Sequence, residues 1–205
     1  MVAGVVLGGV LLAACAGSGY HYVKSSEDRT YFKVPENWKL YDEDQVIKTL
    51  GHNLSPRQRK SQLDNAWHVG FDASSRPALG RHLLDARARN PVGLAAVEEL
   101  DFDTADQLSI NALRNFFVDI DTAIDQGSGE VLTYEPVERD GGFHGIHIVA
   151  NVDDPKGRVM TFDQTSILDQ ATSKLYTLLV TCSANCYEHN KDKIERIVES
   201  WTVKA

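Results

Sequence analysis

Four strand-like stretches joined by short turn sequences fill much of the second half of this 205-residue chain, and they limit its fold more than any other feature. The stretches lie near residues 131–138, 143–152, 158–168 and 174–182. The links between them are short and rich in Asp, Gly, Pro and Ser, which favour turns. Links this short join antiparallel neighbours, because a parallel crossover needs about a dozen residues or more. The pattern therefore predicts an antiparallel meander.

The fourth stretch is apolar on both of its faces. Leu175 and Leu179 fall on one face, and Leu178 and Val180 fall on the other. Successive side chains of a strand point to opposite sides of the sheet, so a strand of this composition is buried on both sides. We therefore predict that it is a central strand of a sheet with helices packed on both faces.

Three earlier strands are expected at residues 31–34, 66–72 and 91–100, where apolar residues alternate with polar or small ones. The least regular part of the chain is residues 74–90. It carries the only local excess of positive charge, from Arg76, Arg81, Arg87 and Arg89. We interpret that stretch as a solvated loop.

Helices are predicted from their caps and periodicity. Asp42 caps a short helix that Gly51 ends, and Ser55 begins another with Gln58 placed to complete a capping box. A long helix is expected near residues 107–125. Its apolar face would hold Ile110, Leu113, Phe117, Ile120 and Ile124.

The last helix has the clearest pattern in the chain. Ile194, Ile197, Val198 and Trp201 recur at the spacing of one helical face, with charged residues between them. We therefore expect residues 29–205 to form a single domain of the α/β (α+β) class. It would have a mostly antiparallel sheet, helices on both faces and a long C-terminal helix.

The first fourteen residues are uncharged and apolar, and they precede Cys15. This stretch is too short to cross a bilayer as a helix but has the length of a signal-peptide core. The sequence Leu12-Ala13-Ala14-Cys15 resembles the lipobox of bacterial lipoproteins. The resemblance implies that residues 1–14 are removed and that Cys15 carries acyl chains. Residues 15–28 would then be a flexible tether between the membrane and the domain.

One departure from the lipoprotein pattern is the lack of a Lys or Arg before the apolar run, which a start codon placed too far downstream would explain. The alternatives are a buried apolar strand or helix at the N-terminus of a cytosolic protein, and a Cys15 that stays a free thiol. We expect the lipoprotein. The protein would then be held on the extracytoplasmic face of the cell membrane.

The two remaining cysteines are Cys182 and Cys186, at the predicted end of a strand and the turn into a helix. If Cys15 is lipidated, two cysteines remain, and outside the cytoplasm an even number of cysteines favours a disulfide. The alternative is a metal site formed by Cys182, Cys186 and His189, but no fourth ligand lies nearby in the sequence. We therefore expect the disulfide and no metal.

Two further motifs carry a resemblance to a known family. A leading strand with Val34-Pro35-Glu36-Asn37-Trp38 and a terminal helix that ends Ser200-Trp201-Thr202-Val203 flank the long antiparallel sheet. Together they look like the PsbP-like superfamily, an α/β/α sandwich that bacterial LpqN-type envelope lipoproteins share. The resemblance implies a mostly non-enzymatic role in assembly or protein binding, and it assigns no binding residues.

A search for catalytic chemistry gives no candidate residues. The sequence contains no nucleophile elbow, zinc-protease motif, phosphate-binding loop or dinucleotide fingerprint, so we expect neither catalysis nor a cofactor. His144 and His147 are three apart on a predicted strand and point to opposite faces, so they cannot chelate one ion together. The seven histidines are expected to be solvated or hydrogen-bonded. A net charge of −8 argues against nucleic acid as a partner.

We therefore expect a lipid-anchored envelope protein that acts as a non-catalytic binding or accessory module, with an envelope protein as its partner. The alternative is a carrier of a small apolar ligand or lipid in a pocket between the sheet and the helices.

Overall fold

The computed structural model describes residues 19–51 and 53–205. The predicted leader 1–14 and the lipidation site Cys15 lie outside the described residues. The predicted tether of residues 15–28 needs correction, because Tyr20–Ser25 form strand β1. Val23 of this strand is buried in the core, and the apolar contact explains why this part of the tether is structured.

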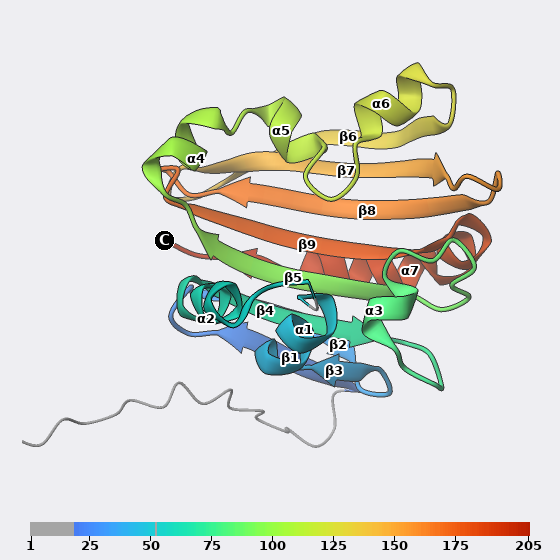
Figure 1. The fold of residues 1–205 in the computed structure, drawn as a ribbon, viewed down its shortest axis with the longest axis horizontal. Helices are drawn as coiled ribbons and strands as arrows, with labels where there is room; N and C mark the ends of the chain where they lie inside the picture. The colour runs from blue at the N-terminus through green and yellow to red at the C-terminus, as the bar shows by residue number, and fades with distance from the viewer. Residues whose placement is uncertain (1–18, 52) are drawn as a thin grey trace, which may run out of the picture.

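A seven-stranded antiparallel sheet forms the centre of the molecule (Figure 1). Its order is β3-β4-β5-β9-β8-β7-β6. The bounds are β3 Lys39–Tyr41, β4 Ala66–Asp72, β5 Val92–Glu99, β6 Gly129–Arg139, β7 Phe143–Asp153, β8 Val159–Leu168 and β9 Lys174–Ser183. The predicted meander is confirmed in strands β6 to β9, and β9 is central because it pairs with β5 on one side and β8 on the other.

One face of this sheet is covered by the C-terminal helix α7 (Ala184–Ser200) and by a small sheet of β1, β2 (Thr30–Pro35) and β10 (Thr202–Val203). In Figure 1, α7 crosses behind the central strands. Ile194, Ile197 and Trp201 are buried against the sheet, as the periodicity predicts. The indole Nε1 of Trp201 donates to Thr30 Oγ1 at 2.9 Å, so the polar end of the ring is also satisfied.

Short helices cover the opposite face (Figure 1). Their bounds are α1 Glu43–Leu50, α2 Pro56–Asn65, α3 Leu79–His82, α4 Phe102–Gln107, α5 Ile110–Arg114 and α6 Ile120–Asp125. The predicted cap at Asp42 and the predicted capping box at Ser55 are present, since Asp42 accepts from Gln45 N and Ser55 accepts from Gln58 N. Two apolar clusters join α1, α3, α5 and α6 to the sheet, one around Leu179 and one around Leu175. The predicted fold class is confirmed.

The prediction of one long helix near residues 107–125 is wrong, because α5 and α6 are separate. Asp119 caps α6 by accepting from Thr122 N at 3.0 Å. Asn115 follows the end of α5, and its amide donates to Asp121 at 2.8 Å across the break. These local hydrogen bonds compete with the helical ones, and only Leu113 and Ile120 of the predicted apolar face are fully buried.

The interpretation of residues 74–90 as a solvated loop is also wrong. Leu79 begins helix α3 and is 1% exposed, and Leu83 one turn later is buried too. The Asp72 carboxylate ties the segment to the sheet, because it accepts from the backbone of Ser74 and Ala78 at 2.8 Å each. The four arginines of this segment are exposed. Their charge suggested a solvated loop, although Leu79 and Leu83 between them are buried.

Candidate binding sites

A groove with a volume of about 430 Å³ lies between helix α7 and strands β6, β7 and β8 of the large sheet. Strand residues Leu132, Thr133, Glu135, His147, Val149 and Asp163 line one side, and Tyr187, Lys191, Glu195, Val198 and Glu199 of α7 line the other. Four of these side chains are carboxylates, so the groove is predominantly acidic.

Three polar side chains form a hydrogen-bond network at the floor of this groove. The Asp163 carboxylate is 2% exposed and accepts from the Tyr187 hydroxyl at 2.6 Å through Oδ2. Its other oxygen, Oδ1, lies 2.9 Å from His147 Nε2. The Glu135 carboxylate lies 3.9 Å from the other ring nitrogen of His147. A buried carboxylate needs such partners, because an isolated charge in the interior is very costly.

The strand register brings this network together. His147 of β7 is opposite Thr165 of β8, and Asp163 is two residues away on the same face. That diagonal separation is within reach of long side chains. Tyr187 reaches the pair from the first turn of α7, whose start Ser183 caps by accepting from Cys186 N.

The environment shifts the pKa values of His147 and Tyr187 in a defined direction. Burial alone would lower the pKa of His147, but the hydrogen bond and charge of Asp163, aided by Glu135, outweigh it and raise the pKa. Burial raises the pKa of Tyr187 far above its usual value, and the adjacent Asp163 charge adds to the increase. Tyr187 is therefore a protonated donor at all physiological pH values.

The chemistry of the groove follows from what a ligand can reach. Asp163 and Tyr187 are buried and hydrogen-bonded to each other, whereas the His147 side chain is 21% exposed. The rim carries Glu135, Glu195 and Lys191 as accessible charged groups. A ligand in the groove can therefore form a hydrogen bond with the His147 imidazole and ion pairs with the charged groups of the rim.

A second cavity, of about 620 Å³, lies at the N-terminal end of α7. Its lining residues are Ala86, Arg87, Arg89, Arg158, Ser183, Asn185, Cys186, His189 and Asn190. The arginines come from the loop before β5 and from the turn between β7 and β8. The backbone N–H of Ser183 donates to Ala88 O at 3.0 Å and joins the loop before β5 to the start of α7.

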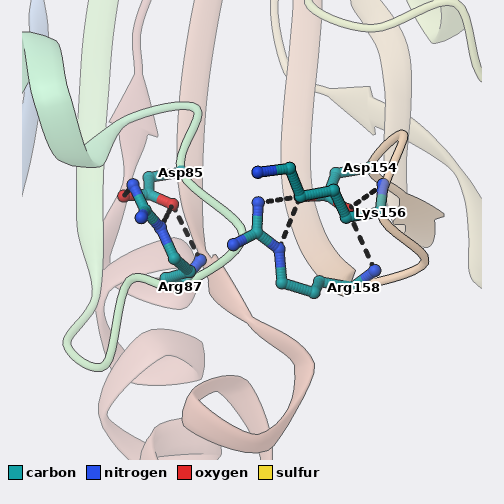
Figure 2. A network of polar contacts seen from close by, with 5 residues as sticks. All are labelled: Asp85, Arg87, Asp154, Lys156 and Arg158. Carbon is teal, nitrogen blue, oxygen red and sulfur yellow. Dashed lines mark hydrogen bonds and ion pairs between the residues drawn. The ribbon is translucent and has the colours of Figure 1, made fainter.

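Two of these arginines are held by carboxylates, and Figure 2 shows the two pairs next to each other. Arg87 donates to Asp85 through Nε at 2.9 Å and Nη2 at 3.0 Å. Arg158 donates to Asp154 through Nε at 2.7 Å and also through Nη2. The hydrogen bond from Arg87 lowers the pKa of Asp85, and the one from Arg158 lowers that of Asp154 to about 2.

The predicted disulfide is present. Cys182 at the end of β9 and Cys186 in the first turn of α7 are bonded, with 5.9 Å between their Cα atoms. The alternative metal site with His189 is therefore excluded, because disulfide sulfurs cannot act as thiolate ligands. The His189 Nδ1 atom lies 2.7 Å from the carbonyl oxygen of Asn185.

Other histidines have structural surroundings. His82 Nδ1 lies 2.7 Å from the buried carboxylate of Asp72, and His68 is buried with its Nδ1 3.7 Å from Glu43. His144 is exposed on the opposite face from His147, as its position in the strand predicts. Across residues 19–51 and 53–205, no group of three or more His, Cys, Asp or Glu is placed to hold a metal ion.

Sequence reasoning missed the network of His147, Asp163 and Tyr187. These residues are separated by 16 and 24 positions, so only the pairing of β7 with β8 and the packing of α7 reveal their contact. A usable signal was the acidic residue Asp163 in the middle of a strand predicted to lie within the meander, because a buried carboxylate requires a partner. Within the described part of the chain, no helix has both the length and the apolar character to span a membrane.

The fold is similar to that of PsbP. The solution structure of cyanobacterial PsbP (CyanoP) from Synechocystis sp. PCC 6803 matches with a TM-score of 0.54 at 16% identity, over 93% of this chain and 96% of that one. At this identity the likeness establishes the fold alone.

Two other solved structures resemble the chain with TM-scores below 0.5. The crystal structure of LpqN from Mycobacterium tuberculosis, involved in cell envelope biogenesis, matches with a TM-score of 0.43 at 15% identity, over 86% of this chain and 83% of that one. The Saccharomyces cerevisiae Ran-binding protein Mog1p matches with a TM-score of 0.46 at 11% identity, over 90% and 95%. The sequence matches no protein-family model and no curated protein.

Proposed function

We propose that this chain is an envelope lipoprotein, anchored by acyl chains on Cys15 to the extracytoplasmic face of the cell membrane, whose folded domain is a non-catalytic binding module. The lipobox-like sequence before Cys15 supports the anchor. The disulfide between Cys182 and Cys186 supports a location outside the cytoplasm, because structural disulfides persist in oxidising environments.

The observation that carries the binding role is the groove beneath α7. Its carboxylates at Glu135, Glu195 and Glu199 surround an imidazole that Asp163 holds in place. An acidic rim around a fixed hydrogen-bonding group is complementary to a basic side chain. The partner we propose is accordingly an envelope protein that inserts a Lys or Arg residue into this groove.

Site-directed photo-crosslinking in intact cells tests this function. A crosslinking amino acid at Glu195, in the groove, is expected to give a discrete adduct with one envelope protein, and His147→Ala is expected to reduce its yield. The matched control is Lys193, which is exposed on the same helix but outside the groove. Equal adducts from both positions would contradict the proposal. So would turnover of a defined substrate by the purified chain that His147→Ala abolishes.

The carrier function is a second candidate, but with a different pocket from the expected one. The groove between the large sheet and α7 is charged and does not suit an apolar ligand. A hollow of about 410 Å³ with a mainly apolar lining instead lies among β1, β2 and the C-terminus, bordered by Tyr22, Val23, Tyr31 and Ala205. Native mass spectrometry of the full chain should then detect a bound apolar molecule that Tyr22→Asp removes.

A further inference from the structure

Positive charge gathers at one cavity of a chain whose net charge is −8. Arg87, Arg89 and Arg158 all line the 620 Å³ cavity at the start of α7. Asp85 and Asp154 pair with two of them, so the cluster keeps one uncompensated positive charge. Arg89 forms no hydrogen bond or ion pair with any residue that the structure describes, which leaves its guanidinium available to a ligand.

The two paired arginines are held in fixed positions by their carboxylates. Asp85 also accepts from the backbone N–H of Arg87 at 3.0 Å, and Asp154 accepts from the backbone of Lys156 at 2.8 Å and Arg158 at 3.0 Å (Figure 2). Each guanidinium uses Nε and Nη2 for its carboxylate, so the N–H groups of Nη1 stay available. Fixing a long side chain beforehand reduces the conformational entropy that binding would cost.

The two ion pairs also act on each other. The charge of Arg158 contributes to lowering the pKa of Asp85, after the larger effect of the Arg87 hydrogen bond. The charge of Asp154 contributes in the same way to raising the pKa of Arg87. Both pairs lie at the same cavity, as Figure 2 shows, although they come from loops far apart in the sequence.

The rest of the wall adds amide donors and little negative charge. The amides of Asn185 and Asn190 come from the first two turns of α7, and the Asn190 amide keeps one N–H beyond the one that it donates to Cys186 O at 2.9 Å. His189 also lines the wall, with its Nδ1 atom engaged by Asn185 O. The positive end of this 17-residue helix lies at the same cavity and adds to the field of the arginines. The disulfide and the hydrogen bond from Ser183 N to Ala88 O keep the helix start and the arginine loop together.

We propose that this cavity is a binding site for a phosphate group, presented either as a soluble phosphate compound or as the head of an anionic lipid. Guanidinium forks match the geometry of phosphate oxygens. A tetrahedral group can accept from arginines on several sides at once, whereas a planar carboxylate accepts mainly within its plane. This cavity shares no lining residue with the groove of the proposed function. The phosphate proposal and the proposed function can therefore be tested, and refuted, separately.

Calorimetric titration with inorganic phosphate tests the site. The full chain in a non-ionic detergent is titrated at constant ionic strength, with chloride as the balancing anion. We expect saturable binding at one site, weakened at least about tenfold by Arg89→Ala and less by Arg89→Lys. Arg89 is exposed and forms no hydrogen bond or ion pair with the described residues, so its loss should leave the thermal transition unchanged. The matched control, Arg76→Ala, removes an exposed arginine of the same segment outside the cavity and should bind normally.

Titration with dihexanoyl phosphatidylglycerol distinguishes the two sources of the phosphate. Tighter binding than inorganic phosphate, lost in Arg89→Ala, assigns the site to a lipid head; weaker binding assigns it to a soluble phosphate compound. Absence of saturable binding for both probes would overturn the proposal. So would an equal loss of affinity in Arg76→Ala and Arg89→Ala, because it would mean that only overall charge matters.

Discussion

Replacing Asp163 with alanine removes the carboxylate that holds His147 and Tyr187 beneath α7. Asp163 is 2% exposed, so its loss leaves a buried hydroxyl and a mostly buried imidazole without their acceptor. Removing one partner of a buried charged pair costs about 3–5 kcal/mol in the free energy of unfolding. For a domain of this size, that corresponds to a fall in melting temperature of roughly 6–20 °C. Asp163→Asn should cost less, because an amide oxygen can still accept from Tyr187.

The loss of stability that Asp163→Ala causes depends on pH. Because the pKa of His147 is raised in the folded state, its ion pair with Asp163 stabilises the protein fully below the unfolded pKa of about 6.5. That contribution is lost as the pH rises through the folded pKa of His147. The difference in the free energy of unfolding between the wild type and Asp163→Ala should therefore be largest near pH 6 and smaller near pH 9.

Urea denaturation followed by circular dichroism at these two pH values measures both quantities. The matched control is Glu135→Ala, because Glu135 also faces His147 but its side chain is 69% exposed. An exposed pair of this kind contributes only about 0–1 kcal/mol. A loss below 1 kcal/mol in Asp163→Ala, or a difference that does not shrink with rising pH, would refute the assignment of a buried ion pair.

Three further perturbations have expected outcomes. Cys182→Ala with Cys186→Ala should lower the free energy of unfolding by about 2 kcal/mol, the entropy of closing so short a loop, and reductant should lower the melting temperature of the wild type but not of the double variant. Gly145→Ala should cost about 1–3 kcal/mol in urea denaturation, because the new Cβ would lie 2.0 Å from Ser166 O of the adjacent strand; an unchanged midpoint would contradict that register. Trp201→Ala should cost about 3–5 kcal/mol by the same measurement, since the ring is 1% exposed, and a cost near zero would contradict its place in the core.

Sequence patterns predict the parts of this fold that local chemistry decides. The meander of β6 to β9 follows from the shortness of its turns, and α1 and α2 follow from caps at Asp42 and Ser55. The predicted helix over residues 107–125 failed because apolar spacing alone ignores competing hydrogen bonds. Asn115 and Asp119 offer such bonds to the backbone and divide the segment.

The candidate sites were predictable only where one local pattern contained them. The disulfide was predictable from the spacing of Cys182 and Cys186 and their position between a strand and a helix. The arginine cavity was predictable only in part. The excess positive charge of residues 74–90 was evident from the sequence, and two of the lining arginines come from that stretch. Arg158 joins it from another turn, through strand pairing that no local pattern specifies. The groove network depends on the same long-range pairing.

Mass spectrometry of the mature protein, extracted from the membrane fraction and measured with and without reductant, tests the central claim most directly. We predict a chain that begins at Cys15, carries the mass of acyl chains on that residue and gains two hydrogen atoms on reduction of the bond between Cys182 and Cys186. An unacylated chain that keeps Met1, is found in the soluble fraction and does not change mass on reduction would contradict the account.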